Sequence, residues 1–430
     1  MASPSQPAAA GAPSPPAPST ESAEQAADPV GIRVLATPFD RMPASIDEAT
    51  ALALRKRFEG VAMPAVVDAL RRYRDFVVDE YLPRCRETIA ATALPDGEAY
   101  YAHCLRVHTT TNLGAREIHE IGLGEVRRIR REMIEVIHRT DFIDLHPDAA
   151  SLDEEALFRR FIEYLRTDPR FYHTSDTELL TGYRDICKRV DGWLPRMFRV
   201  LPRLSYGVKP IPRFMAAAQT TAYYQPGDIR NGEAGYFCAN TFRLEMRPKY
   251  EMVALSLHES VPGHHLQISL AKELEGLPEF RRQSRINAFV EGWALYAERL
   301  GVENGMYADP YDDFGRLLYE MWRACRLVVD PGMHALGWTR EQAMAFLRDN
   351  TALSELNIQT EIDRYIGWPG QACGYKLGEL TIRALRAEAE RRLGPDFDIR
   401  AFHDAVLGAG ALPLDLLEAR VRQWIDAAAK

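Results

Sequence analysis

The 430-residue sequence has no long apolar run, no excess of basic residues and few cysteines. It lacks the run of about 18 apolar residues that crosses a bilayer, so we expect no membrane span. Lys and Arg total 53 against 61 Asp and Glu, and a net charge of −8 argues against nucleic acid as a partner. The six cysteines form no C-x-x-C pair, which favours mostly buried thiols in a reducing compartment.

Residues 1–32 are rich in Ala, Pro and Ser and poor in large apolar side chains. Such a segment cannot bury enough apolar surface to fold, so a disordered tail is predicted. The first basic residue is Arg33, and no apolar core precedes a cleavage site. A signal peptide is therefore not expected, and we predict a cytoplasmic protein.

Residues 33–430 contain no second linker, which favours a single, mostly helical domain. Apolar residues recur at helical intervals over 116–139 and over 284–300, and Gly301 is a candidate helix stop. One stretch, 206–246, is typical of two or three short strands, at 206–212, 220–224 and 235–242. The last is a candidate edge strand for an extended peptide, and the alternative is a small structural hairpin.

Three of the eleven histidines fall within eight residues, at His258, His264 and His265. Two imidazoles and a carboxylate leave the fourth position of a tetrahedral zinc open, which is typical of a catalytic site. Glu291, on another predicted helix, can supply that carboxylate. Glu259 cannot easily share the metal, but it can accept a proton from a water that the metal activates.

The spacing of these histidines departs from the usual H-E-x-x-H motif, whose ligands stand four residues apart on one helical face. Here the candidates follow His258 by six or seven residues, and six residues carry a regular helix about 9 Å along its axis and roughly 120° around it. Pro262 lacks an N–H and crowds the preceding turn, so the helix must kink or bulge there, and Gly263 can absorb the change. Either His264 or His265 can then approach the metal.

Two longer motifs carry a resemblance to a known family. They are His258-Glu-Ser-Val-Pro-Gly-His-His-Leu-Gln267 and Glu291-Gly-Trp-Ala-Leu-Tyr-Ala-Glu298. They resemble the H-E-x-x-P-G-H-x-x-Q and E-G-W-A-x-Y patterns of the domain of unknown function 885 family, over most of 50–425. Members of that family generally have a longer region before the matched part, so we expect this chain to be shorter than its relatives.

The resemblance implies a helical zinc-metallopeptidase-like protein of the gluzincin type. It implies that His258, His264 and Glu291 bind Zn²⁺ and that Glu259 is the general base, with His265 as the reserve ligand. The implied fold is mainly α, a zincin-like domain with the small β element before the metal-binding helix.

Five further residues are weaker candidates, each with an ordinary structural alternative. Tyr375 could stabilise an oxyanion or simply pack, and Arg364 could bind a substrate carboxylate or lie on the surface. Gln267 and Glu298 are candidates to orient the ligands. His334 is either a donor at a second site or a core histidine.

The favoured function is hydrolysis of a peptide or small amide by a zinc-activated water. Two alternatives remain. Two histidines and one carboxylate also form the site of non-haem iron oxygenases, although Glu259 would then have no role. A non-catalytic helical binding protein would hold no stoichiometric metal. The sequence does not fix the oligomeric state.

Overall fold

The computed structural model describes residues 34–40, 42–217 and 219–429. By their contacts, residues group into two units, divided after Arg86. The sequence predicts one domain over 33–430, and the contacts group the residues of that range separately before and after Arg86. The predicted tail over 1–32 lies outside the described residues.

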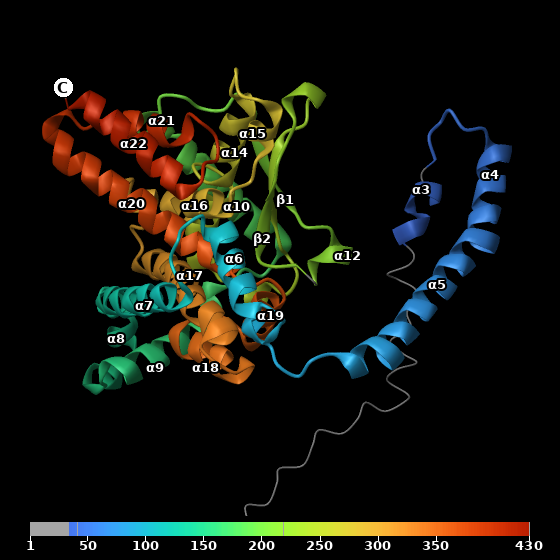
Figure 1. The fold of residues 1–430 in the computed structure, drawn as a ribbon, viewed down its shortest axis with the longest axis horizontal. Coiled ribbons are helices and arrows are strands. Elements are labelled where there is room, and N and C mark those ends of the chain that lie inside the picture. Colours follow the sequence, from blue (N-terminus) through green and yellow to red (C-terminus); the bar gives the residue numbers. More distant parts are fainter. Residues whose placement is uncertain (1–33, 41, 218, 430) are drawn as a thin grey trace, which may run out of the picture. The chain divides into compact units, whose positions relative to one another are not determined.

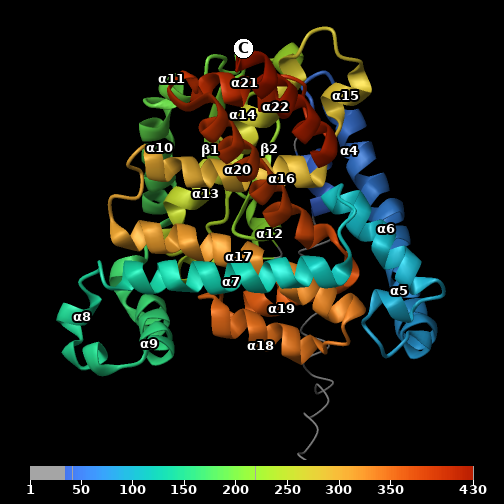
Figure 2. The ribbon, with the colours of Figure 1, turned by 60° about the vertical axis from the view of Figure 1, so that its left-hand side comes forward.

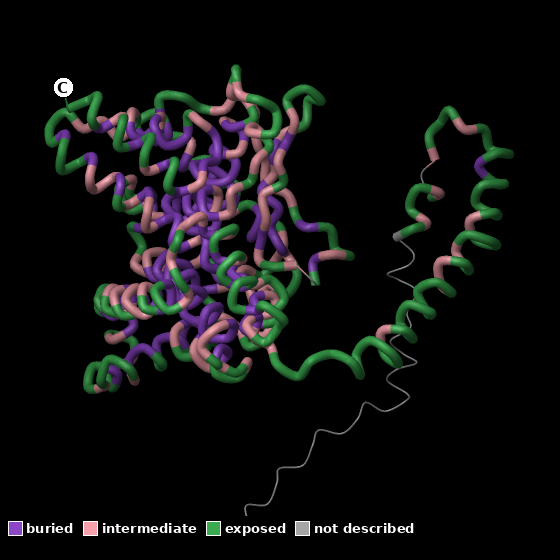
Figure 3. The backbone as a smooth tube through the Cα atoms, viewed as in Figure 1, coloured by how far each residue is buried: buried purple, intermediate pink, exposed green. Residues whose placement is uncertain are grey.

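In the part of the first unit that the structure describes, the α-helices are α3 (Thr37–Asp40), α4 (Glu48–Arg57) and α5 (Met63–Asp75). Helix α4 begins where the Asp47 side chain accepts a hydrogen bond from the Thr50 amide at 2.9 Å. Among the described residues from Leu35 to Arg86, only Ala51 is buried, as the exposed backbone of this unit in Figure 3 illustrates. This unit therefore has little core of its own.

The second unit is mainly helical (Figure 1). Its helices are α6 (Gly97–Thr109), α7 (Ala115–Ile137), α8 (Phe142–Leu145), α9 (Glu154–Thr167), α10 (Asp176–Asp191), α11 (Leu194–Met197), α12 (Arg213–Ala216), α13 (Met252–Glu259), α14 (His264–Glu273), α15 (Glu279–Gln283), α16 (Asn287–Glu303), α17 (Pro310–Ala335), α18 (Arg340–Asn350), α19 (Glu355–Gly367), α20 (Gly374–Leu393), α21 (Ile399–Leu407) and α22 (Leu414–Ala428). The prediction of a mainly α fold is confirmed.

A three-stranded sheet precedes helix α13, as expected. Its strands are β1 (Tyr206–Pro210), β2 (Ala222–Gln225) and β3 (Gly235–Ala239), in the order β1-β3-β2. β1 pairs with β3 in parallel, and β2 pairs with β3 antiparallel. β3 is thus the central strand, so the prediction that 235–242 is an edge strand is wrong. Both of its sides are taken by partners, and β2 is an edge strand instead.

Two large hydrophobic cores hold the second unit together. One gathers residues of α10, α13, α16 and α20 to α22, and the other gathers residues of α7, α9 and α17 to α19. Helix α17 lies along α7, and α16 packs against α20 (Figure 2). Because α13 and α16 belong to one core and α17 and α19 to the other, a site lined by all four lies where the cores meet.

The predicted stop at Gly301 is wrong, because α16 continues to Glu303. A Cβ atom at Gly301 would lie 2.6 Å from the Leu257 side chain and 2.7 Å from the Tyr307 ring. The glycine therefore permits close packing inside the core rather than ending the helix.

Two predictions from composition can be compared with the structure. None of the described helices combines the length and the apolar character needed to cross a bilayer. All six cysteines are free, and four of them, Cys187, Cys238, Cys325 and Cys373, are buried, as expected.

Candidate metal centre

The helix that carries the histidine motif is broken at the predicted place. Helix α13 ends at Glu259 and α14 begins at His264, with Pro262 in the break. A Cβ atom at Gly263 would lie 2.0 Å from the His258 carbonyl oxygen, so only glycine allows the chain to turn this closely. The break changes the direction in which His264 points relative to His258.

As a result, three potential ligands converge. Nε2 of His258 and Nε2 of His264 each lie 3.6 Å from Oε2 of Glu291. One ligand atom of each residue lies within 4.8 Å of the others. Donor atoms around a tetrahedral zinc at about 2.0–2.1 Å would stand roughly 3.4 Å apart. The spacing of these three groups therefore fits a zinc ion.

The Glu298 carboxylate fixes the orientation of one of these imidazoles. Nδ1 of His258 donates to Oε1 of Glu298 at 2.7 Å, and both side chains are buried. Nε2 of His258 then faces Glu291 and His264, where it could offer its lone pair to a metal ion. A carboxylate behind a ligating histidine is a common arrangement in metal sites. Glu298 thus contacts one of the candidate ligands, and its role in orienting a metal ligand stays a prediction.

His265 points elsewhere, although it adjoins His264 in the sequence. Its Nε2 donates to the Leu204 carbonyl oxygen at 3.1 Å, and its Nδ1 accepts from the Tyr224 hydroxyl at 2.9 Å. Both ring nitrogens are thus used within the protein. The structure brings His264, and not the reserve candidate His265, to the cluster.

Glu259 lies buried beside the cluster, with 7% of its surface exposed, and its Oε2 has no hydrogen-bond partner among the described residues. Burial raises the pKa of this carboxyl to about 7. Although burial favours a neutral imidazole, bonds to Glu291 and Glu298 raise the pKa of His258 to about 9. A cation bound among the carboxylates of Glu259, Glu291 and Glu298 would be stabilised by their negative charge, and a metal ion can be that cation.

A cavity of about 680 Å³ opens onto these residues, within the range typical of small-molecule sites. Its lining comes from α6, β2, α13, α14, α16, α17, α19 and α20, and it includes Glu259, Tyr375 and Arg364. Ala222, Tyr223 and Tyr224 place the β2 edge strand along it. Tyr375 and Arg364 are thus brought to the cluster's cavity, as expected of functional candidates.

Three of the weaker candidates do not line this cavity: Glu298, which lies behind His258, and Gln267 and His334. Gln267 is buried and lines a separate hollow of about 590 Å³. His334 is fully buried; its Nδ1 accepts from the Ala91 amide at 3.1 Å and its Nε2 donates to the Tyr365 carbonyl oxygen at 3.0 Å. His334 is therefore a core histidine, one of its two expected interpretations.

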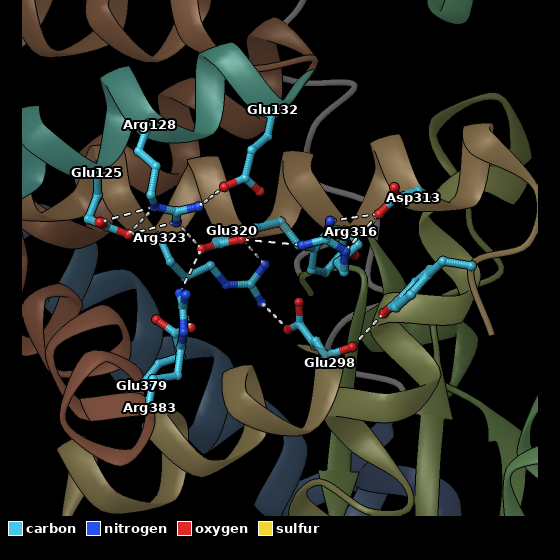
Figure 4. A network of polar contacts seen from close by, with 12 residues as sticks. Glu125, Arg128, Glu132, Glu298, Asp313, Arg316, Glu320, Arg323, Glu379 and Arg383 are labelled. Atoms are coloured by element: carbon cyan, nitrogen blue, oxygen red, sulfur yellow. Dashed lines mark hydrogen bonds and ion pairs between the residues drawn. The ribbon is translucent and has the colours of Figure 1, made fainter. Parts of the chain in front are cut away.

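Three arginines of the cavity were not expected from the sequence: Arg285, and Arg323 and Arg326 on α17. The signal was present, because two charged residues three positions apart interrupt an otherwise apolar stretch of that helix. Arg323 reaches toward Glu298 beside a network of ion pairs around Glu320, in which Arg128 and Arg316 take part (Figure 4). Charged groups thus continue from the cluster into the protein.

Comparisons with known proteins agree with this fold but name no activity. The profile of the family described as "Bacterial protein of unknown function (DUF885)" matches residues 2–421. A solved structure of a "putative lipoprotein" from Colwellia psychrerythraea is 34% identical, with a TM-score of 0.81 over 90% of this chain and 65% of that one. This chain therefore spans less than two thirds of that protein's length.

A second solved structure, of a "putative lipoprotein of unknown function" from Shewanella oneidensis, is 20% identical, with a TM-score of 0.66. The match covers 92% of this chain and 71% of that one, and it shows the fold alone. No curated protein matches the chain.

Proposed function

This chain belongs to the DUF885 family, and we propose that it is a zinc-dependent hydrolase that cleaves peptide bonds. The observation that carries the proposal is the convergence of His258, His264 and Glu291 next to the buried carboxyl of Glu259. Four elements form a site of the gluzincin type. They are α13 and α14 on either side of the sharp break, α16 with the downstream glutamates, and the edge strand β2.

In this proposal His258, His264 and Glu291 hold the zinc, and Glu298 keeps the His258 ring in place. When bound, zinc supplies Lewis acidity that activates a water and polarises a carbonyl group. Glu259 accepts the proton of the attacking water at its unpartnered Oε2 and passes it to the leaving nitrogen.

The cavity also provides groups for the substrate. Tyr375 lines it and can donate its hydroxyl to the developing oxyanion. The free side of β2 can pair with the main chain of an extended peptide. β2 thus takes the peptide-binding role that the sequence analysis expected of the strand at 235–242. The substrate class is therefore a peptide or a small amide.

The experiment is metal analysis of the purified full chain combined with cleavage of a mixed peptide library, with and without a chelator. We expect about one zinc per chain and cleavage that the chelator abolishes and zinc restores. Stoichiometric iron would favour the two-histidine, one-carboxylate oxygenase instead. Absence of bound metal and of any effect of the chelator would favour the non-catalytic binding protein.

The cellular compartment is a separate question. The sequence predicts the cytoplasm, whereas the solved structures from Colwellia and Shewanella are each described as a "putative lipoprotein". Fractionation of cells that produce the natural protein, followed by immunoblotting, decides between the cytoplasm and the envelope.

A further inference from the structure

One wall of the cavity, beside the cluster of His258, His264 and Glu291, carries three arginines. Arg323 and Arg326 come from α17 and Arg364 comes from α19. Arg323 and Arg326 are each only 4% exposed, and the Arg364 side chain is 26% exposed. Buried guanidinium groups are costly unless carboxylates and hydrogen bonds compensate them.

The protein does not fully supply this compensation. Arg326 and Arg364 share one carboxylate, because Nη2 of each lies within 3.0 Å of Oε2 of Glu361. Arg323 has Glu298 at 3.9 Å, but that carboxylate is already bonded to a ring nitrogen of the metal cluster. Glu361 therefore serves two guanidinium groups, and the carboxylate paired with Arg323 is engaged elsewhere. The other hydrogen bonds of these arginines go to neutral oxygens, those of Tyr365, Gln371 and Tyr319.

Individual guanidinium N–H groups also lack hydrogen-bond acceptors. Nη1 of Arg326 and Nε of Arg323 are buried, and neither has a hydrogen-bond partner among the described residues. Glu291 is also close enough for Arg326 to help lower the pKa of its carboxyl. A metal ion bound to Glu291 would neutralise its charge, so the need for an anion on this wall would increase.

Aromatic rings hold the guanidinium groups in place. The Arg326 guanidinium carbon lies 4.4 Å from the Trp322 ring centre and 4.5 Å from the Tyr375 ring centre. Arg323 lies 4.5 Å from the Tyr319 ring and 4.7 Å from the Trp322 ring. Such stacking keeps the planar groups rigid and partly dehydrated, which favours tight binding of a planar anion.

We propose that Arg326, supported by Arg323 and Arg364, binds a carboxylate of the substrate in this cavity. The proposal rests on the proposed peptidase function and narrows it to peptides that carry a carboxylate near the cleaved bond. An arginine binds a carboxylate through two parallel N–H···O bonds, a geometry that a neutral amide cannot match. The carboxylate comes either from the C-terminus of the peptide or from an Asp or Glu side chain.

The first test compares cleavage of matched peptides by the full chain. One series ends in a free carboxylate, a second has the same residues with a C-terminal amide, and a third is amidated but contains one internal Glu. We expect kcat/KM to be at least about tenfold higher for a carboxylate-bearing series than for the neutral one. The preferred series identifies the source of the carboxylate.

The variants link this preference to the arginines. In Arg326→Gln we expect the preference to fall to within about twofold, and in Arg326→Lys, which keeps the charge but loses the planar fork, to fall partly. Arg364→Gln, at a partly exposed position, should also reduce the preference for carboxylate-bearing peptides, and it replaces Arg326→Gln in the test if that variant does not fold. Arg348→Gln, a surface arginine paired with Glu355, is the control and should keep the full preference.

A binding measurement separates this inference from the hydrolase proposal. Calorimetric titration of Ala-Ala-Ala, its amide and Ala-Glu-Ala amide into Glu259→Gln should show at least tenfold tighter binding of a carboxylate form, lost when Arg326→Gln is added. If no peptide is cleaved but this pattern holds, the hydrolase proposal fails and the carboxylate site stands. Two outcomes overturn the carboxylate site even where cleavage is found. One is equal kcat/KM and equal affinity for neutral and carboxylate-bearing peptides, and the other is a preference that is unchanged in both Arg326→Gln and Arg364→Gln.

Discussion

Oε1 of Glu298 accepts a hydrogen bond from Nδ1 of His258 at 2.7 Å, and both groups are buried. Glu298 follows Glu291 by seven residues on α16, about two helical turns, so both carboxylates face the same histidine. One helix thus supplies a candidate metal ligand and the group that orients a second ligand.

The first prediction concerns this pair. Glu298→Gln should weaken zinc binding roughly 10- to 100-fold, because the neutral amide holds the imidazole less firmly and makes it a poorer donor. Competition with a chromophoric chelator measures the change. Glu303→Gln, near the exposed end of the same helix, is the control. Unchanged zinc affinity in Glu298→Gln would assign the pair a purely structural role.

The second prediction distinguishes the two neighbouring histidines. His264→Ala should lose stoichiometric zinc, and His265→Ala should keep it, because both ring nitrogens of His265 already bond to Leu204 and Tyr224. A ligand that binds only the folded state stabilises it by about 2.7 kcal/mol at 100 times its Kd. Zinc should therefore raise the Tm of the wild type and of His265→Ala, but not that of His264→Ala. The reverse pattern would make His265 the ligand.

The third prediction tests the general base. Glu259→Gln should bind zinc normally and lose roughly 100- to 10,000-fold in kcat, the usual contribution of a positioned proton acceptor. Zinc content and peptide cleavage, measured on the same sample, check both parts. A variant that retains full activity would remove Glu259 from the reaction.

Much of the site could be predicted from the sequence, because local patterns carry its chemistry. The histidine and glutamate motifs named the three residues that converge, and Pro262 with Gly263 predicted the break between α13 and α14. A proline effect depends on its immediate neighbours, so the sequence is sufficient for it. The helix expected over 116–139 is likewise α7 (Ala115–Ile137), since its apolar periodicity is local.

Features that depend on distant partners could not be predicted in this way. The order β1-β3-β2 depends on which strands pair across the chain, so the central position of β3 does not follow from its residues. The residues around Gly301 look the same whether the glycine ends a helix or allows another segment to pack closely against it. The close approach of Leu257 and Tyr307 shows that the second role applies. Arg323 and Arg326 of α17 line the same cavity wall as Arg364 of α19 only because these two helices pack side by side, and no local motif predicts that packing.

The fourth prediction concerns Lys376, a fully buried lysine on α20. Its ammonium lies 2.7 Å from Glu320, 2.8 Å from Glu379 and 3.1 Å from Glu125. Lys376→Met should lower the free energy of unfolding by about 3–5 kcal/mol, because it leaves buried carboxylates without their cation. Urea denaturation measures the loss, and the exposed Lys188→Met is the control. A variant as stable as the wild type would show that the surrounding arginines compensate the carboxylates alone.

The fifth prediction uses the pH dependence of stability. Glu361 is 3% exposed; burial alone would raise the pKa of its carboxyl, but Arg326 and Arg364 outweigh it and lower that pKa from 4.5 to about 2. A carboxyl with a lowered folded-state pKa stabilises the protein fully above its ordinary pKa, and this contribution disappears as the pH falls through the folded-state value.

The lost contribution should be on the order of 3 kcal/mol between about pH 5 and pH 2. Glu361→Gln cannot titrate there, so the difference in unfolding free energy between wild type and variant should be largest above pH 5 and shrink toward pH 2. Urea denaturation of both proteins at several pH values measures it. The exposed Glu355→Gln should show a much smaller change, since water screens its pair with Arg348. A difference between wild type and Glu361→Gln that does not vary with pH would mean that Glu361 stabilises the fold by hydrogen bonding rather than by its charge.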